Sequence, residues 1–293
     1  MSITLADRRR FYAEEIEAVA SLRTRALVEA LATVPREDFL APGPWKIAVA
    51  DPVRPGAASY RDTLDADPRH VYHNVLVALD PGRQLNNGHP SSLCGWIDAL
   101  ALAAGERVFH LGCGSGYYTA LMAAVVGPSG AVVAAEVDPT LAGIARAGLA
   151  RFGTVEVREG DGFGVDPGPV DAVLVNAGVT HLQPSWLDRL RPGGRLLVPI
   201  TFAPPGARTG SGVMVLVRRG DDGYRAQALG SVAIYSAEGG RSPALNERMR
   251  AALARLAQGG FQSLWSVRRE PHEPDDSCWL HADGACLSMG ERR

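Results

Sequence analysis

The chain has 293 residues and a formal net charge of −2 at neutral pH, with 46% hydrophobic and 21% charged residues. This length exceeds one minimal domain, so we expect a core with additions at both ends. A charge so close to zero argues against broad binding of nucleic acid or of a membrane surface. The hydrophobic content suffices for an ordinary packed core.

Residues 1–10 lack the apolar run of a signal peptide, and the longest strongly apolar stretch, near 121–126, is too short to span a bilayer. The 4 cysteines are unevenly spaced, which is typical of reduced thiols. We therefore expect a cytoplasmic enzyme without a membrane partner. The sequence carries no signal for its oligomeric state.

In the N-terminal part, apolar residues at helical spacing predict an amphipathic helix over Phe11–Leu31, with a break near Ser21. The Pro-, Gly- and Asp-rich stretch 42–68 indicates irregular structure. Alternating apolar residues predict a strand over Val71–Leu79. A helix over Ser91–Leu102, capped by one of its first two serines, is expected to enter the core.

A glycine-rich turn follows and is the most informative feature of the chain. The apolar stretch Val108–Leu111 leads into Gly112-Cys113-Gly114-Ser115-Gly116, then into an Ala-rich helix at 117–126 and a strand at Ala131–Glu136. Strand, glycine turn, helix, strand and acidic residue form the βαβ unit that binds adenosine cofactors. The glycines allow a sharp turn close to the ligand, and the carboxylate of Glu136 can accept hydrogen bonds from both ribose hydroxyls.

Three more core segments follow in order. Residues 155–162 form a strand that ends in an acidic turn, Gly160-Asp161-Gly162. Residues 170–176 form a buried-type strand that closes in Asn176, and residues 190–200 combine a Pro-Gly-Gly turn with a β-rich run.

Beyond Gly206 the expected elements are shorter. Strands are predicted at 213–217 and 231–235 and a helix at 244–257, and the tail shows three short strand patterns, at 262–267, 278–281 and 285–287. These tail strands would form a sheet extension or a small lid.

The spacing of the glycine turn distinguishes between cofactors. Dinucleotide-binding loops have the pattern G-x-G-x-x-G, but here Tyr117 and Tyr118 follow a G-x-G-x-G turn. The pattern and the segments after it resemble S-adenosylmethionine-dependent methyltransferases. The resemblance implies that S-adenosylmethionine is the cofactor, with S-adenosylhomocysteine as product, and that the acid at Asp161 holds the adenine amino group. The expected cofactor-binding residues are His110, Gly112, Cys113, Gly114, Ser115, Gly116, Glu136, Val137, Asp161, Gly162 and Asn176.

The expected fold is α/β: a Rossmann-like methyltransferase core, doubly wound, with a mostly parallel sheet. An N-terminal helical and loop region on the substrate side (residues 1–90) would precede the cofactor-binding core (91–220), and a C-terminal α+β extension (221–293) would follow it. In this arrangement the strand at 131–136 lies beside the strand at 108–111, which brings Glu136 to the ribose.

The flanking sequence narrows the resemblance. The phrase Val34-Pro35-Arg36-Glu37-Asp38-Phe39, the Gly160-Asp161-Gly162 turn and the ending Pro199-Ile200 are similar to protein-L-isoaspartate O-methyltransferases. The likeness covers roughly residues 20–220, apart from unfamiliar sequence at about 46–83. It implies an enzyme that O-methylates a carboxylate, isoaspartyl or aspartyl, of a protein or peptide.

One segment departs from that family. The family carries a short Ile-Ser-x-Pro phrase whose serine lies at the reacting carboxylate, whereas this chain has Asn86-Asn87-Gly88-His89-Pro90. Alignment on the proline places Gly88 at the serine, and a slip of one residue places Asn87 there. We expect Asn87, Gly88 and His89 to form the acceptor site, with Asn87 or nearby backbone amides orienting the carboxylate over the cofactor's methyl group.

Alternatives remain open from sequence alone. A small metabolite's oxygen or nitrogen can be the acceptor, and an amine or phenol would more often need a base, which His89 or His181 can supply. A catalytically silent cofactor-binding module is a third possibility. No metal is expected, because Cys278-x2-His281-x4-Cys286 offers only three ligands at a spacing that fits no standard zinc pattern.

Overall fold

The computed structural model describes residues 3–50 and 58–290, and within the chain it forms two compact units. The first unit comprises Met1–Gly105, Cys113–Val132 and Asp138–Val157. The second comprises Glu106–Gly112, Val133–Val137 and Arg158–Arg293.

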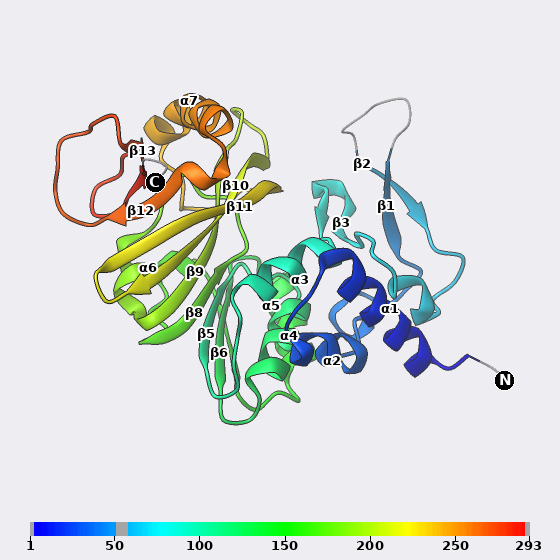
Figure 1. Ribbon diagram of the computed structural model, residues 1–293. Helices are drawn as coiled ribbons and strands as arrows, with labels where there is room; N and C mark the ends of the chain where they lie inside the picture. The colour runs from blue at the N-terminus through cyan, green and yellow to red at the C-terminus, as the bar shows by residue number, and fades with distance from the viewer. Residues whose placement is uncertain (1–2, 51–57, 291–293) are drawn as a thin grey trace. The chain divides into compact units, whose positions relative to one another are not determined.

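The first unit is mainly helical (Figure 1). Helices α1 and α2, blue in Figure 1, pack together, and α2 also contacts the strongly apolar α4, in which nearly every side chain is buried. Two small hairpins, β1 with β2 and β3 with β4, complete it. Its elements are α1 (Leu5–Ala20), α2 (Arg25–Thr33), η1 (Glu37–Phe39), β1 (Lys46–Ala50), β2 (Ala58–Asp62), η2 (Pro68–Val71), β3 (Ala78–Asp80), η3 (Pro81–Arg83), β4 (Leu85–Asn86), α3 (Pro90–Ala99), α4 (Tyr117–Val126) and α5 (Pro139–Leu149).

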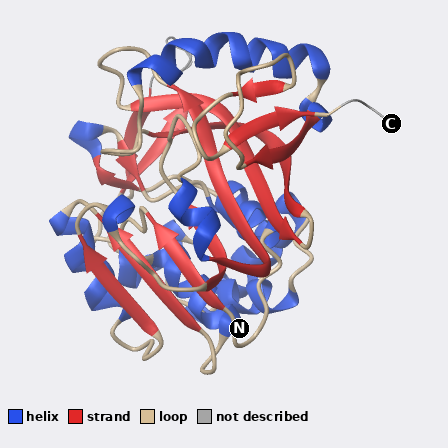
Figure 2. Ribbon diagram, turned by 90° about the vertical axis from the view of Figure 1, so that its left-hand side faces the viewer, coloured by secondary structure: helices blue, strands red, loops and turns tan. Residues whose placement is uncertain are grey.

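A ten-stranded sheet has the order β13-β14-β12-β11-β10-β9-β8-β5-β6-β7, and most of it belongs to the second unit. The long strands β9, β10 and β11, green to yellow in Figure 1, are among the red strands of Figure 2. The elements are β5 (Arg107–Leu111), β6 (Ala131–Glu136), β7 (Val155–Glu159), η4 (Gly162–Gly164), β8 (Val170–Val175), α6 (Pro184–Arg189), β9 (Leu190–Phe202), β10 (Thr209–Gly220), β11 (Gly223–Tyr235), α7 (Pro243–Gly259), η5 (Phe261–Ser263), β12 (Leu264–Arg268), β13 (Cys278–Leu280) and β14 (Cys286–Met289).

One apolar core runs through the second unit. Inward-facing residues of β5, β8, β9 and β10 join buried side chains of α6 and α7, among them Trp186 and Met249. The tail strands contribute Trp279, whose indole N–H donates to the carbonyl of Ala252 on α7 at 2.6 Å. The C-terminal extension is therefore continuous with the sheet, as one of the two predicted arrangements required.

The sheet is mixed. Strands β5, β8 and β9 pair in parallel, whereas β9 through β14 pair antiparallel. The Rossmann-like α/β class is confirmed, and β6 is the neighbour of β5 as expected. The prediction of a mostly parallel sheet overlooked how far the antiparallel strands extend, because β10 and β11 run well beyond the apolar runs visible in the sequence.

Some predictions of local structure are confirmed and others are wrong. The helix break at Ser21 is confirmed: this residue ends α1 in the left-handed conformation with φ 51°. The strand predicted at 71–79 is wrong, since only Ala78–Asp80 is extended there. The irregular stretch 42–68 contains the β1–β2 hairpin. The prediction that Ser91 or Ser92 caps α3 is wrong: His89 is the N-cap residue, and Pro90 takes the first helical position. The boundaries 90/91 and 220/221 stay a prediction.

Candidate active site

The glycine turn between β5 and α4 has a backbone that other residues rarely adopt. Gly112, Gly114 and Gly116 have φ values of 75°, 58° and 96°. A Cβ on Gly116 would lie 3.0–3.2 Å from atoms of Leu149 and Ala145 on α5. Glycine is therefore required here both for the left-handed conformation and for the close approach of the next helix.

Two of the predicted cofactor-binding residues, Glu136 and Asn176, lie in the second unit at the ends of the strands that flank β5. Glu136 is the last residue of β6 and is only 7% exposed, and its carbonyl accepts the Gly160 N–H at 2.8 Å. Asn176, directly after β8, donates from its backbone N–H to Leu111 and from Nδ2 to the Gly112 carbonyl. These bonds hold the end of β8 to the end of β5, and the end of β6 to the turn after β7.

Asp161 lies in the turn after β7. Its Oδ1 accepts the Phe163 N–H at 3.0 Å, which caps the short helix η4, and the side chain is exposed. A Cβ on the next residue, Gly162, would come within 2.7 Å of Leu111, so this position admits only glycine. Gly162 is therefore required by packing, and the carboxylate of Asp161 beside it is exposed.

The remaining predicted residues differ in accessibility. His110 is fully buried within β5, and burial lowers the pKa of its imidazole to about 3, so the ring is neutral. Cys113 and Ser115 are also buried, whereas Val137 is 41% exposed. Their contact with a cofactor stays a prediction.

The residues present fit an adenosine cofactor. A Cβ on Gly114 would meet no atom within 4 Å, so there is open space on that side of the turn. The buried carboxylate at the end of β6 is the acceptor that ribose hydroxyls require.

The predicted acceptor segment lies in the first unit and centres on Asn87. Its side chain is 8% exposed, and its Oδ1 accepts hydrogen bonds from Arg36 Nη2 at 3.1 Å and from the Val77 N–H at 3.2 Å. Two donors on the oxygen fix the orientation of the amide. The opposite atom, Nδ2, is buried and has no hydrogen-bond partner among the described residues. A buried donor without a partner is costly unless a ligand satisfies it.

Arg36 organises this segment, although it is not among the site residues predicted from the sequence. Its side chain is completely buried. Besides Asn87, the guanidinium donates to the carbonyls of Val71, His73 and Val75 at 2.7, 3.1 and 2.8 Å. A planar cation with five donors suits such a set of carbonyls. The available signal was the Val-Pro-Arg-Glu phrase, which we used only for resemblance.

Gly88 contributes backbone alone. Its φ is 83°, and an added Cβ would lie 3.1 Å from atoms of both Leu93 and Tyr118. The Tyr118 hydroxyl donates to the Gly88 carbonyl at 3.0 Å, which ties the acceptor segment to the first turn of α4, just after the glycine turn. A serine would be strained at this position, so Asn87 is the residue that can offer a side chain in place of the family serine.

The two loop histidines are both neutral. His89 Nδ1 lies 3.1 Å from Ser91 Oγ, which also accepts from Asn74 Nδ2 at 3.0 Å. Burial, followed by the charge of Arg36, lowers the pKa of His89. In the second unit, burial likewise lowers the pKa of His181, and its ring nitrogens lie 3.0 Å from Thr180 Oγ1 and 3.1 Å from Gln183 Nε2.

Comparison with known proteins distinguishes between the functions that the sequence left open. The family model for protein-L-isoaspartate(D-aspartate) O-methyltransferase (PCMT) matches residues 68–237. The chain belongs to this family. A protein-L-isoaspartate O-methyltransferase of Rhodopseudomonas palustris (strain HaA2) is 34% identical over 67% of this chain and 69% of its own length. One of Methylorubrum extorquens (strain PA1) is 32% identical over 74% and 83%.

Solved structures show the same fold. A structure titled protein-L-isoaspartate O-methyltransferase superposes with a TM-score of 0.60 and covers 96% of this chain and 88% of that one at 21% identity. The PCMT from Plasmodium falciparum, solved with S-adenosyl-L-homocysteine, gives 0.58 with 78% and 98% coverage at 17% identity.

Family membership establishes the class of reaction. The protein is an S-adenosylmethionine-dependent O-methyltransferase. The small-metabolite and silent-module alternatives are not favoured. Within the part of the chain that the structure describes, no helix has both the length and the apolar character needed to cross a membrane.

Proposed function

We propose that this PCMT-family enzyme methylates the side-chain carboxylate of isoaspartyl, or of a particular aspartyl, residue in a protein or peptide. The observation that carries the acceptor site is the buried Asn87 Nδ2, a neutral donor without a partner among the described residues. It stands where the family serine is expected. The names of the relatives support an isoaspartyl acceptor.

The acceptor chemistry needs orientation rather than a base. A carboxylate with an ordinary pKa near 4 is already ionised at neutral pH. A cationic partner would lower the nucleophilicity of the carboxylate, whereas a neutral amide such as Asn87 orients the carboxylate and leaves it nucleophilic. Holding nucleophile, methyl carbon and sulfur in line can supply about 7–11 kcal/mol of the barrier.

The cofactor-holding residues are proposed from the glycine turn and the strand ends. Backbone groups of 112–116 approach the cofactor, Glu136 accepts from the ribose hydroxyls, and Asp161 accepts from the adenine amino group. When bound, the cofactor supplies an electrophilic sulfonium methyl group. The protein's own part is to orient the acceptor and to keep Arg36 bonded to carbonyls, away from the nucleophile.

A cavity in the first unit is proposed to take the residues that flank the acceptor. Its volume is about 500 Å³, and its lining includes Arg61, Asp62, His73 and Asn74. Asn74 connects this wall to the acceptor segment through its hydrogen bonds with Ser91. The mixed charges suit a peptide rather than an apolar metabolite.

The decisive assay incubates the full-length protein with methyl-labelled S-adenosylmethionine and a matched pair of peptides that differ only in isoaspartyl against aspartyl. Base-labile label on the isoaspartyl peptide alone supports an isoaspartyl acceptor, and base-labile label on the aspartyl peptide alone supports a particular aspartyl residue as acceptor. Base-stable label on either peptide contradicts carboxylate methylation. An Asn87→Ala variant serves as the control for turnover at the proposed site.

A further inference from the structure

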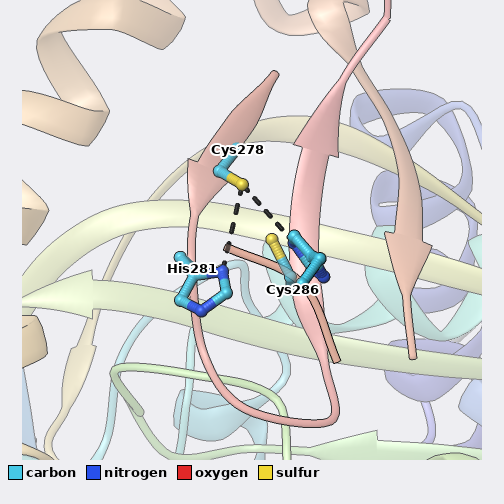
Figure 3. A group of neighbouring side chains, drawn as sticks. Cys278, His281 and Cys286 are labelled. Atoms are coloured by element: carbon cyan, nitrogen blue, oxygen red, sulfur yellow. Dashed lines mark hydrogen bonds between the residues drawn. The ribbon is translucent and has the colours of Figure 1, made fainter. Parts of the chain in front are cut away.

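The C-terminal extension contains a cluster of metal-ligating side chains. His272, Cys278, His281 and Cys286 place one possible ligand atom each within 4.8 Å of all the others. Figure 3 shows Cys278 on β13, Cys286 on β14 and His281 just after β13 turned toward one another. His272 comes from the segment between β12 and β13 and supplies the fourth ligand, which the sequence pattern of three did not include.

We propose that these four residues, here called the Cys2His2 cluster, bind one structural zinc ion. Four protein ligands of this kind complete a tetrahedral shell and leave no open position. With ordinary Zn–S and Zn–N bond lengths, neighbouring ligand atoms of a tetrahedral site lie about 3.3–3.8 Å apart. The Cys278 Sγ lies 3.6 Å from His272 Nε2 and 3.9 Å from His281 Nδ1.

The tautomer of His272 suits metal binding. Its Nδ1 lies 2.7 Å from the Glu270 carbonyl oxygen, which can only accept, so Nδ1 carries the proton and the Nε2 lone pair faces Cys278. An oxygen on the far nitrogen of a ligating histidine is the arrangement that orients zinc ligands. In His281 the nitrogen that faces Cys278 is Nδ1.

The surroundings of the Cys278 sulfur favour a thiolate. Arg268 Nη2 donates to Cys278 Sγ at 2.7 Å, and the Asp275 N–H donates to the same sulfur at 3.4 Å. Arg268 is itself held by both carboxylate oxygens of Asp275 at 2.9 and 3.2 Å. Cys286 is completely buried and Cys278 is 5% exposed, so a bound ion would be shielded from water.

A zinc ion here would fasten residues 269–277, which contain no helix or strand, to the hairpin of β13 and β14. Structural zinc sites contribute directly to folding free energy. The main alternative is a disulfide between Cys278 and Cys286, which would leave both histidines without a role.

The test measures metal content of untagged full-length protein, purified under reducing conditions, desalted and analysed by mass spectrometry. We expect one zinc per chain in the wild type and in Cys94→Ala, which removes a buried cysteine outside the cluster. Cys278→Ser and His272→Gln should lose it. Arg268→Met, which removes the donor to sulfur and the ion pair with Asp275 but none of the four ligands, should keep zinc but bind it about 10–100-fold more weakly.

Wild-type protein provides the readout that does not depend on a variant folding. After zinc removal and addition of cobalt, tetrahedral thiolate coordination should give intense visible absorption. Chelation should also expose 269–277 to limited proteolysis. Wild-type protein that takes up neither zinc nor cobalt, or that holds Cys278 and Cys286 in a disulfide after reduction and air exposure with zinc present, overturns the proposal.

Discussion

The glycine turn and the acceptor segment are built in opposite ways. The turn depends on local sequence: three alternating glycines take left-handed conformations between β5 and α4. The acceptor segment depends on distant sequence, because Arg36 binds Asn87, which lies 51 residues further along the chain. The same guanidinium binds three backbone carbonyls between them. A change in the turn should therefore act on backbone conformation, whereas a change at Arg36 should release a whole segment.

This difference explains where the family pattern can vary. The cofactor turn admits little substitution, since each glycine is fixed by its own conformation. The buried cation in the acceptor segment binds the carbonyls of Val71, His73 and Val75 as well as the Asn87 side chain, so a different residue at position 87 would leave the three carbonyl bonds in place. If residue 87 orients the acceptor as proposed, its identity would set the acceptor preference.

The largest effect is expected from Arg36→Met. The variant leaves several buried carbonyls without their donor, and bonds from a charged donor are worth about 1.5–3 kcal/mol each, so we expect at least about 3 kcal/mol of destabilisation. Denaturant unfolding measures it. Arg25→Met, at a side chain that is 75% exposed, is the control and should stay within about 0.5 kcal/mol of wild type. Equal effects of the two variants would contradict the role given to Arg36.

Asn87→Ala sharpens the comparison on the acceptor side. If Nδ2 orients the carboxylate, turnover should fall roughly ten-fold to a thousand-fold, a transition-state loss of about 1.4–4 kcal/mol, with cofactor affinity unchanged. Because Oδ1 also accepts from Arg36, the melting temperature must be followed in parallel. Asn87→Ser should raise the preference for isoaspartyl peptide. Full turnover in both variants would remove Asn87 from the site.

Glu136→Ala tests the cofactor side. Loss of the proposed ribose acceptor should weaken binding of S-adenosylmethionine or S-adenosylhomocysteine about ten-fold to a hundred-fold, or about 1.5–3 kcal/mol. Calorimetry gives the affinity directly. Affinity for the cofactor that equals wild type would show that Glu136 is misplaced, and tight binding of NAD by wild type would conflict with the glycine-turn argument.

The sequence was sufficient where short-range rules decide the structure. The pattern of 108–136 predicted β5, α4 and β6 because strand, glycine and helix signals lie next to one another. The strand predicted at 71–79 was wrong. Apolar alternation indicated a strand there, but the backbone carbonyls of Val71, His73 and Val75 all accept hydrogen bonds from the Arg36 guanidinium. His272 was missed for a similar reason: only the fold brings it to Cys278.

The pH dependence of stability tests whether His110 is core or site. Its pKa falls from 6.5 to about 3 on folding, so the unfolded chain takes up the proton first and stability is lost as pH falls below 6.5. At pH 5 the loss should be about 2 kcal/mol relative to neutral pH. His110→Gln should flatten this slope, which denaturant titrations at several pH values would reveal. A slope identical to wild type would mean that His110 is not buried as described.

The smallest expected effect comes from Tyr118→Phe, which cuts the one bond described between the acceptor segment and α4. The hydroxyl donates to the Gly88 carbonyl at 3.0 Å, so its loss should cost about 0.5–1.5 kcal/mol of stability while the ring keeps its packing. If the bond also positions the segment for catalysis, kcat should fall more than the stability loss explains, and cofactor affinity should hold. Tyr224→Phe is a matched comparison, because it removes a hydroxyl-to-carbonyl bond of the same length, from Tyr224 to Leu187 in the second unit. Parallel losses of turnover in the two variants would argue that the bond at Gly88 only supports the fold. A loss of turnover in Tyr118→Phe alone would show that the bond between α4 and Gly88 positions the acceptor segment for catalysis.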